Sequence, residues 1–333
     1  MRRSMIGGIV RAFASVAVLA LLSFATAQAE ELKVWRHGVL EAKSDAGFVF
    51  MPAEGGFAKK HGLDLKMLQF KGDALALRAL LAGELDSYEG NPGAPIIAAS
   101  HGGGVKIVGC YWPGLTYAIY SKPSINSVEE LKGKTFALSS PGSLPDLVVR
   151  AVLEKHNIAA NEVRFSVMGS DADRFKAVSA GIVDAGAAST GFEPIAQKNN
   201  VKTLVSIHDE VPNYLRFCIN VSEKTLKERG DDLARFLAAE MDAQRYALSH
   251  RDAVIALANK MTNAPAGDPR AAFVFDEAKR VSAIDPELKL PVDKLEWMQQ
   301  LFVRTGNLKE PIDVKSLIAP EPRERALKLV GKE

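Results

Sequence analysis

Hydroxyl groups gather in the segment "LSSPGSLPDLVVRAVL" at residues 138–153. A strand is expected to end before Ser139, Ser140 and Ser143, and a helix is expected to begin just after them. Free backbone N–H groups and the helix dipole favour an anion at such a helix start, for example a carboxylate or a sulfonate. The alternative is that these serines only cap the helix.

Polar side chains also follow two other predicted strands. The segment "SYEGNPG" places Tyr88 and Asn91 at the end of one strand, and "AASTGF" places Thr190 at the end of another. Ligands of open α/β sheets bind outside the carboxyl ends of the strands, so each of these residues is a candidate ligand contact. Ordinary loop polarity is the alternative for each of them.

An aromatic pair and several cationic side chains are further candidate ligand contacts. In "CYWPG", Tyr111 and Trp112 could cover a planar or apolar ligand, or they could pack between two parts of the protein near a hinge. The strand "VWRHG" ends with His37, and further along the chain Lys71 and Arg216 carry charges that could pair with an anion. Each of these cations is more often a solvated surface charge.

The sequence contains no complete catalytic motif. The segment "HGGG" at 101–104 resembles an oxyanion-hole motif, but the G-x-S-x-G elbow that it requires is missing. No H-E-x-x-H motif, Walker A loop or G-x-G-x-x-G fingerprint occurs. In "GSDAD", two carboxylates are too few for a calcium loop. We therefore expect a protein without catalytic residues, metal or cofactor.

A repeated phrase indicates how the chain positions these candidates. "LDLKMLQF…ALLAGELDS" and "EVRFSVM…AVSAGIVDA" share an alternating strand, then a helix, then a second strand. Asp73 and Asp171 are expected to cap the two helices, which end at Gly83 and Gly181. Each short strand–helix–strand unit is expected to make two neighbouring parallel strands.

Each copy continues upstream, with the strands "LKVWRHG" (32–38) and "KTFALSS" (134–140). The chain is thus predicted to form two doubly wound α/β lobes joined by two crossover strands, near residues 117–124 and 211–217. The first lobe comprises residues 30–117 and 218–333, with a helical C-terminal part, and the second comprises residues 118–217. Two lobes with a hinge could close around a small molecule.

The N-terminal residues predict export. A short basic stretch, an apolar run and a small-x-small site before Glu30 have the order of a cleavable signal peptide, residues 1–29. Its removal takes away Arg2, Arg3 and Arg11 and changes the formal charge from +2 to −1. A nearly neutral chain has no global field for nucleic acid or anionic membrane. No other stretch of the sequence is long and apolar enough to span a bilayer, so the signal peptide leads us to expect a soluble periplasmic protein.

The two cysteines, Cys110 and Cys218, both fall beside the predicted crossover strands. An oxidising compartment permits a disulfide between them, but their separation cannot be read from the sequence. Two buried free thiols are the preferred expectation, and a disulfide is the alternative.

The order of these segments resembles a known family. "GLDLKMLQF", "ALLAGELDSYEG", "SVEELKGKTFALSSPGS" and "RFKAVSAGIVDAGAAS" are similar to the substrate-binding proteins of ABC importers for nitrate, sulfonates, taurine and thiamine precursors, over most of residues 32–250. The resemblance implies a type II periplasmic-binding fold and a monomer that delivers a solute to permease subunits with their ATPase.

By position, the resemblance places the ligand contacts in the turns that contain His37, Tyr88, Asn91, Ser140, Ser143 and Thr190, with Trp112 at the hinge. We expect a small organic anion of sulfonate or carboxylate type. A neutral pyrimidine-type thiamine precursor, a ligand-sensing receptor domain and an enzyme of the same fold are the alternatives. The cysteine-rich stretch of the pyrimidine-forming relatives is absent, which argues against that enzyme.

Overall fold

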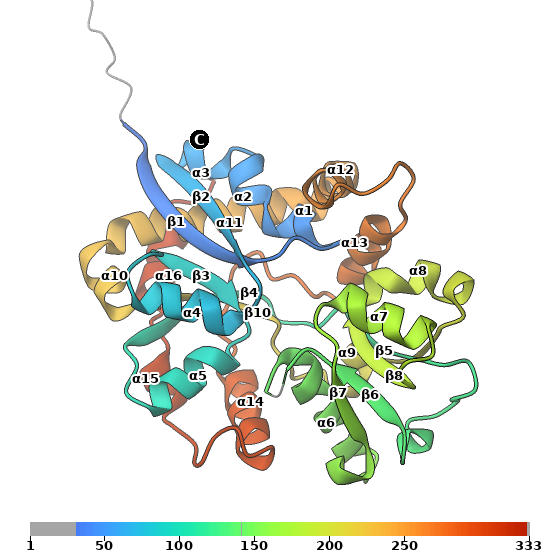
Figure 1. Cartoon of the computed structure of the whole chain (residues 1–333). Coiled ribbons are helices and arrows are strands. Elements are labelled where there is room, and N and C mark those ends of the chain that lie inside the picture. Colours follow the sequence, from blue (N-terminus) through green and yellow to red (C-terminus); the bar gives the residue numbers. More distant parts are fainter. Residues whose placement is uncertain (1–30, 141, 332–333) are drawn as a thin grey trace, which may run out of the picture. The chain divides into compact units, whose positions relative to one another are not determined.

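A computed structural model describes residues 31–140 and 142–331. The predicted signal peptide lies outside these residues. Leu32–Glu333 form one compact unit that contains two five-stranded sheets (Figure 1). The fold is α/β with two lobes, as the sequence predicts, and each lobe is built around one of these sheets.

The first sheet has the strand order β2-β1-β3-β10-β4. Its strands are β1 (Lys33–Leu40), β2 (Leu63–Phe70), β3 (Ser87–Gly90), β4 (Val105–Trp112) and β10 (Phe217–Ser222). The second sheet has the order β7-β6-β8-β5-β9. Its strands are β5 (Tyr117–Ser121), β6 (Thr135–Leu138), β7 (Arg164–Val167), β8 (Ala185–Ser189) and β9 (Lys202–Ser206).

The two sheets repeat one topology. β1 pairs in parallel with β2 and β3, and β6 pairs in parallel with β7 and β8. The fourth strand of each sheet, β10 or β5, is antiparallel to both of its neighbours. The chain changes sheet between Trp112 and Tyr117 and returns between Ser206 and Phe217. The residue limits of the two domains stay a prediction.

One detail of the predicted topology is wrong. The strands on either side of each repeated helix are not neighbours, because β1 lies between β2 and β3 and β6 lies between β7 and β8. β2 and β7 are edge strands with many half-exposed residues, whereas β1 is buried along its second half. The more apolar strand of each copy thus takes the inner position, where both of its faces can be covered.

Helices surround both sheets. In the first lobe they are α1 (Ala46–Val49), α2 (Met51–Glu54), α3 (Phe57–Lys60), α4 (Asp73–Leu81), α5 (Gly93–Ser100), α10 (Glu223–Glu228), α11 (Gly230–Ser249), α12 (Arg251–Thr262), α13 (Arg270–Arg280), α14 (Val292–Arg304), α15 (Val314–Leu317) and α16 (Glu321–Leu327). In the second lobe they are α6 (Leu144–Lys155), α7 (Asp171–Ser179), α8 (Glu193–Ala196) and α9 (Ile207–Glu210), with 3₁₀ turns η1 (Glu129–Leu131), η2 (Ala160–Glu162), η3 (Thr190–Phe192) and η4 (Gln197–Asn199).

The repeated helices end as predicted. Gly83 and Gly181 follow α4 and α7 with φ of 79° and 72°, the left-handed conformation that glycine adopts without strain. The predicted helical stretch 231–261 is divided at His250 into α11 and α12.

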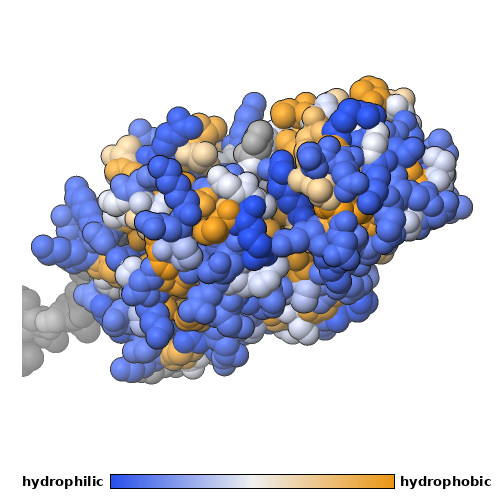
Figure 2. Space-filling model, turned by 90° about the horizontal axis from the view of Figure 1, so that it is seen from below, coloured by the Kyte–Doolittle hydropathy of each residue, from blue (hydrophilic) through white to orange (hydrophobic). Residues whose placement is uncertain are grey.

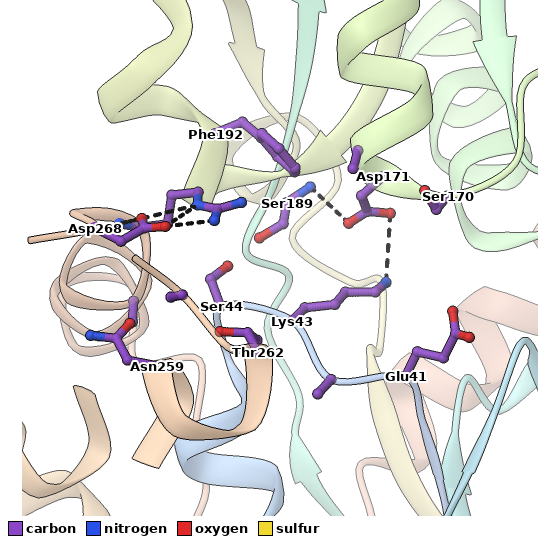
Figure 3. Close-up of a pocket in the computed structure, with 15 residues that line it drawn as sticks. Glu41, Lys43, Ser44, Ser170, Asp171, Ser189, Phe192, Asn259, Thr262 and Asp268 are labelled. Carbon is purple, nitrogen blue, oxygen red and sulfur yellow. Dashed lines mark hydrogen bonds and ion pairs between the residues drawn. The ribbon is translucent and has the colours of Figure 1, made fainter. Parts of the chain in front are cut away.

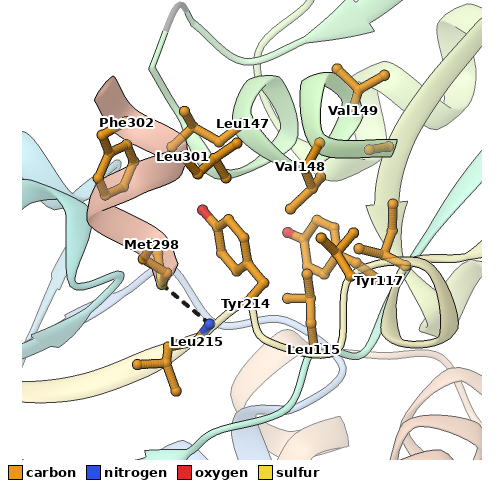
Figure 4. Close-up of a cluster of buried hydrophobic side chains, with 14 of the residues drawn as sticks. Leu115, Tyr117, Leu147, Val148, Val149, Tyr214, Leu215, Met298, Leu301 and Phe302 are labelled. Atoms are coloured by element: carbon orange, nitrogen blue, oxygen red, sulfur yellow. Dashed lines mark hydrogen bonds between the residues drawn. The ribbon is translucent and has the colours of Figure 1, made fainter. Parts of the chain in front are cut away.

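The joint between the lobes is a buried apolar cluster (Figure 4). Leu147 and Val148 of α6 share it with Met298 of α14, and Tyr214 of the second crossover lies between them. Lys294 of α14 donates hydrogen bonds of 2.9 Å to the carbonyl oxygens of Pro113 and Pro212. One side chain thus ties both crossovers together.

The cysteines are bonded, so the preferred expectation of free thiols is wrong. Cys110 and Cys218 form a disulfide with a Cα–Cα distance of 3.9 Å. β10 lies directly beside β4 in the sheet, which brings together two residues that are 108 positions apart in the chain.

The surface is mixed in character. On the face shown in Figure 2, hydrophilic residues predominate and hydrophobic ones are interspersed among them. Among the described residues, no helix is both long enough and apolar enough to cross a membrane.

Candidate functional site

A cavity of about 300 Å³ is lined by residues of both lobes (Figure 3). The first lobe contributes the loop after β1 and the region around the α12–α13 connection, with Glu41, Ala42, Lys43, Ser44, Asn259, Thr262, Ala264, Asp268, Arg270 and Ala271. The second lobe contributes Ser170, Asp171, Ala172, Ser189 and Phe192. The volume lies at the lower end of the range for small-molecule sites.

Asp171 is the charged centre of the second-lobe wall. Its carboxylate accepts hydrogen bonds from the Tyr117 hydroxyl at 2.7 and 2.9 Å, the Ser189 amide at 3.2 Å and Arg174 Nη2 at 2.5 Å. Lys43 Nζ of the first lobe lies 3.5 Å from its Oδ1. Burial raises the pKa of Asp171, but Lys43, Arg174 and the hydrogen bonds outweigh burial and hold it below the usual value.

Lys43 is the cation that crosses the cavity. Besides Asp171, it donates to the Tyr117 hydroxyl at 3.3 Å. Burial acts to lower its pKa, but the attraction of Asp171 and Tyr117 is greater, so the pKa lies above the usual value. Figure 3 shows its side chain directed toward Asp171 from the loop below.

The predicted capping role of Asp171 is wrong. Ser170 is the N-cap of α7, and its hydroxyl accepts from the Asp173 amide at 3.2 Å. Asp171 is the first residue of the helix, which leaves its side chain free to reach Tyr117 and Lys43. Asp73 likewise follows the N-cap Gly72, and its Oδ1 accepts from the Asn91 amide at 2.8 Å instead of capping α4.

Arg270 and Asp268 form the second charged pair of the wall. Arg270 Nε donates to Asp268 Oδ1 at 2.9 Å, and the arginine lowers the pKa of this aspartate. The guanidinium lies 6.0 Å from the ring centre of Phe192, an aromatic side chain of the second lobe. Both cations of the cavity thus already have a carboxylate partner, and Glu41 adds a third carboxylate.

Next to the cavity, Arg216 of the second crossover contacts residues at the first crossover. Its guanidinium lies 4.3 Å from the Trp112 ring and 4.5 Å from the Phe217 ring, and it pairs with Asp45. It also donates to Thr116 Oγ1 at 3.1 Å. Burial lowers its pKa to about 9, which leaves it charged at neutral pH.

None of the seven predicted contact residues lines this cavity. His37 and Tyr88 are fully buried in the first lobe, where His37 Nδ1 lies 2.7 Å from Ser87 Oγ. Trp112 is fully buried beside the Phe48 ring. Asn91 donates from Nδ2 to the Tyr214 hydroxyl at 2.6 Å.

The remaining three lie in the second lobe. The Thr190 amide donates to the Thr116 carbonyl at 3.1 Å, next to the cavity residue Ser189. Ser143 is the N-cap of α6 and its hydroxyl donates to the Ser140 carbonyl at 2.5 Å, while Ser140 is exposed. The structure therefore does not bring the seven residues together, and their contact with a ligand stays a prediction.

Only weak sequence signals point to the residues that do line the cavity. Lys43 and Ser44 belong to a polar turn after β1, and Asp171 belongs to the repeated phrase. The segment "NAPAGDP" before Arg270 is rich in glycine and proline, which indicates a loop between helices. No group of His, Cys, Asp and Glu within the described part of the chain is arranged to hold a metal ion.

A known protein shares part of this sequence. A protein of Bacillus subtilis (strain 168) named as a binding protein, YtlA, is 25% identical over 210 residues, which span 59% of this chain and 60% of YtlA. The match thus covers less than two thirds of that relative.

Solved structures share the fold. The periplasmic nitrate-binding protein NrtA from Synechocystis PCC 6803 superposes with a TM-score of 0.75 at 13% identity, covering 91% of this chain and 90% of NrtA. The periplasmic aliphatic sulphonate binding protein SsuA from Escherichia coli gives 0.70 at 20% identity, covering 86% and 97%. The desulfurization enzyme DSZB gives 0.65 at 16% identity, covering 89% and 99%.

A family profile gives the assignment. The family described as NMT1/THI5 like matches residues 43–254, more than half of the chain. This stretch runs from Lys43 through the whole second sheet and into α12, so it includes both crossovers. The chain belongs to the NMT1/THI5-like family.

Proposed function

We propose that this protein is the solute-binding component of an ABC importer and holds a small organic solute between its two lobes. The observation that carries the proposal is the cavity of about 300 Å³, whose wall is shared by the loop after β1, the start of α7 and the start of α13. A site divided between two lobes couples binding to closure, because only the closed arrangement supplies all contacts.

A small organic anion, of sulfonate or carboxylate type, is the first candidate solute. Residues at the N-termini of α7 and α13 line the cavity, and a helix N-terminus favours negative charge. Lys43 and Arg270 could each donate further hydrogen bonds to an anionic group. The names of SsuA and NrtA describe a sulphonate binder and a nitrate binder, which supports an anionic solute, and the sulphonate supports an organic one.

A neutral pyrimidine-type thiamine precursor is the second candidate, and one observation favours it. Lys43 and Arg270 are already paired with Asp171 and Asp268, so an anion must compete with two carboxylates. Phe192 offers an aromatic face to a planar ring. The charge of the bound solute distinguishes the two candidates.

We also propose where the protein acts and with which partners. The protein is exported to the periplasm by a cleavable signal peptide, acts as a monomer and docks on the permease subunits after closure. Binding takes place without turnover of the solute. A ligand-sensing receptor domain would use the same site and differ only in its partner.

The test begins with the chain from residue 30 to the C-terminus. Native mass spectra before and after denaturation identify any solute that copurifies, and calorimetry then measures the affinity of alkanesulfonates, short carboxylates and aminopyrimidines. The proposal expects one class to bind with a micromolar or lower Kd, about −8 kcal/mol or more favourable. Binding of no small molecule in these classes, or chemical conversion of the bound one, would contradict it.

Two variants locate the site. Lys43→Met and Arg270→Gln should each weaken binding of an anion at least about tenfold, because each removes a charge-assisted hydrogen bond. Lys198→Met, on an exposed turn of the second lobe, is the matched control and should leave the affinity unchanged. If the solute is an anion, equal affinities in all three variants would show that it binds elsewhere.

A further inference from the structure

The two lobes approach one another closely at Gly191. A Cβ placed there would lie 2.4 Å from Ser44 Oγ and 3.1 Å from both Ser44 Cβ and Val274 Cγ2. Gly191 is buried in η3 of the second lobe, whereas Ser44 and Val274 belong to the first. Only a hydrogen atom fits this contact without movement of a neighbour.

Ser44 belongs to the loop 41–45 between β1 and α1, and its two neighbours in this loop also make contacts away from the first lobe. Lys43, the residue before it, pairs with Asp171 across the cavity. Asp45, the residue after it, pairs with Arg216 at the second crossover. Three successive residues of loop 41–45 therefore contact the second lobe or the crossover that leads back from it.

The loop is held firmly on its own side. α1 begins at Ala46, and a Cβ on Gly47 would lie 2.0 Å from the Val254 carbonyl oxygen of α12. On the other side of Gly191, α13 packs against η3 and α8 of the second lobe. Loop 41–45 therefore has little room to move away from Gly191, because α1, the helix that follows it, packs closely against α12.

We infer that Gly191 and loop 41–45 are positioning elements that set how far the second lobe closes over the cavity. The missing side chain at Gly191 permits the short separation, and the Lys43–Asp171 pair favours it electrostatically. A side chain at position 191 acts as a wedge that holds the lobes apart. This inference rests on the proposed function, since closure matters only if the cavity holds a solute.

The experiment requires no solute, so an incorrect solute class would not affect it. Small-angle scattering gives the radius of gyration of the chain from residue 30, and hydrogen exchange reports on residues 41–45 and 189–192. Gly191→Ala should increase the radius of gyration and Gly191→Leu should increase it more, with faster exchange in both segments. Ser44→Gly combined with Gly191→Ala should return both values toward those of the wild type.

The same two substitutions at Gly72 are the control, because Gly72 has an extended φ of 169° and no atom within 4 Å of the added Cβ. They should leave scattering and exchange unchanged. A folded Gly191→Leu protein with wild-type scattering and exchange would overturn the inference. If Gly191→Leu fails to fold, Gly191→Ala decides alone, and a failure of Ser44→Gly to reverse its effect would equally overturn it.

Discussion

Asp73 and Asp171 occupy the same place in the two copies of the repeat, but of the two only Asp171 forms ion pairs with cations of the described residues. Each is the first residue of its helix, after Gly72 or Ser170. Asp171 contacts Lys43 and Arg174, which lower its pKa, whereas burial raises the pKa of Asp73 to about 6. The pKa of the aspartate is thus raised in one copy of the repeat and lowered in the other, because the surroundings of the two helices differ.

Asp73→Asn should stabilise the protein at neutral pH. In the native state the Asp73 carboxyl ionises near pH 6, and in the unfolded chain it ionises near pH 3.8. Wild-type stability from this group therefore falls as the pH rises from 4 to 6 and is constant above. The advantage of the variant in free energy of unfolding should grow by about 1–2 kcal/mol over that range, which is less than the full pKa difference would give because Asp73 is only half-buried. Urea unfolding at pH 4 and pH 7 measures it, and Asp252→Asn, at a fully exposed side chain, should show no such growth.

Asp171→Asn should have the opposite effect. The depressed pKa of Asp171 means that its contribution is present above the unfolded pKa near 3.8 and is lost as the pH falls through the native value. Breaking a buried pair leaves Arg174 without its carboxylate, at a cost of about 3–5 kcal/mol at pH 7. Urea unfolding should show a smaller loss at pH 3. A loss that does not depend on pH would mean that the charge of Asp171 is unimportant.

The repeat made the fold predictable, since strand and helix periodicity and the two C-terminal glycines are local signals. The strand ends were harder to predict. The sequence placed His37 at the end of its strand, but β1 continues to Leu40, so the turn that reaches the cavity is 41–45 and His37 is buried. Tyr88 likewise lies within β3 and not after it.

The site itself depends on contacts between distant parts of the chain. Lys43, Asp171 and Arg270 meet around one cavity although more than a hundred and twenty residues separate the first two. Short-range patterns cannot indicate that α13 of the first lobe packs against η3 and α8 of the second. The disulfide was uncertain for the same reason, because it depends on the insertion of β10 beside β4.

Removal of the Cys110–Cys218 disulfide should destabilise the protein by about 2–4 kcal/mol, because the bond closes a long loop of the unfolded chain. Urea unfolding of Cys110→Ala/Cys218→Ala against the oxidised wild type measures the loss. A reducing agent should bring the wild type close to the double variant and leave the double variant unchanged. If reduction does not change the wild type, the disulfide contributes nothing to stability.

The Arg216–Asp45 pair can be separated from the aromatic contacts of Arg216 by a double-mutant cycle. Arg216→Met leaves Asp45 buried without its cation, which should cost about 3–5 kcal/mol. If the pair carries the loss, Arg216→Met/Asp45→Ala should be less destabilised than the sum of the single variants, by about 1–3 kcal/mol.

The double variant could instead lose as much stability as the two single variants together. Such additive losses would mean that the contacts of the guanidinium with the Trp112 and Phe217 rings, and its hydrogen bond to Thr116, account for the role of Arg216. Arg216→Lys distinguishes the two cases further, because lysine keeps the charge for Asp45 but lacks the planar guanidinium that lies over the rings. A lysine variant as stable as the wild type would assign the contribution to the ion pair, and one as unstable as Arg216→Met would assign it to the aromatic rings.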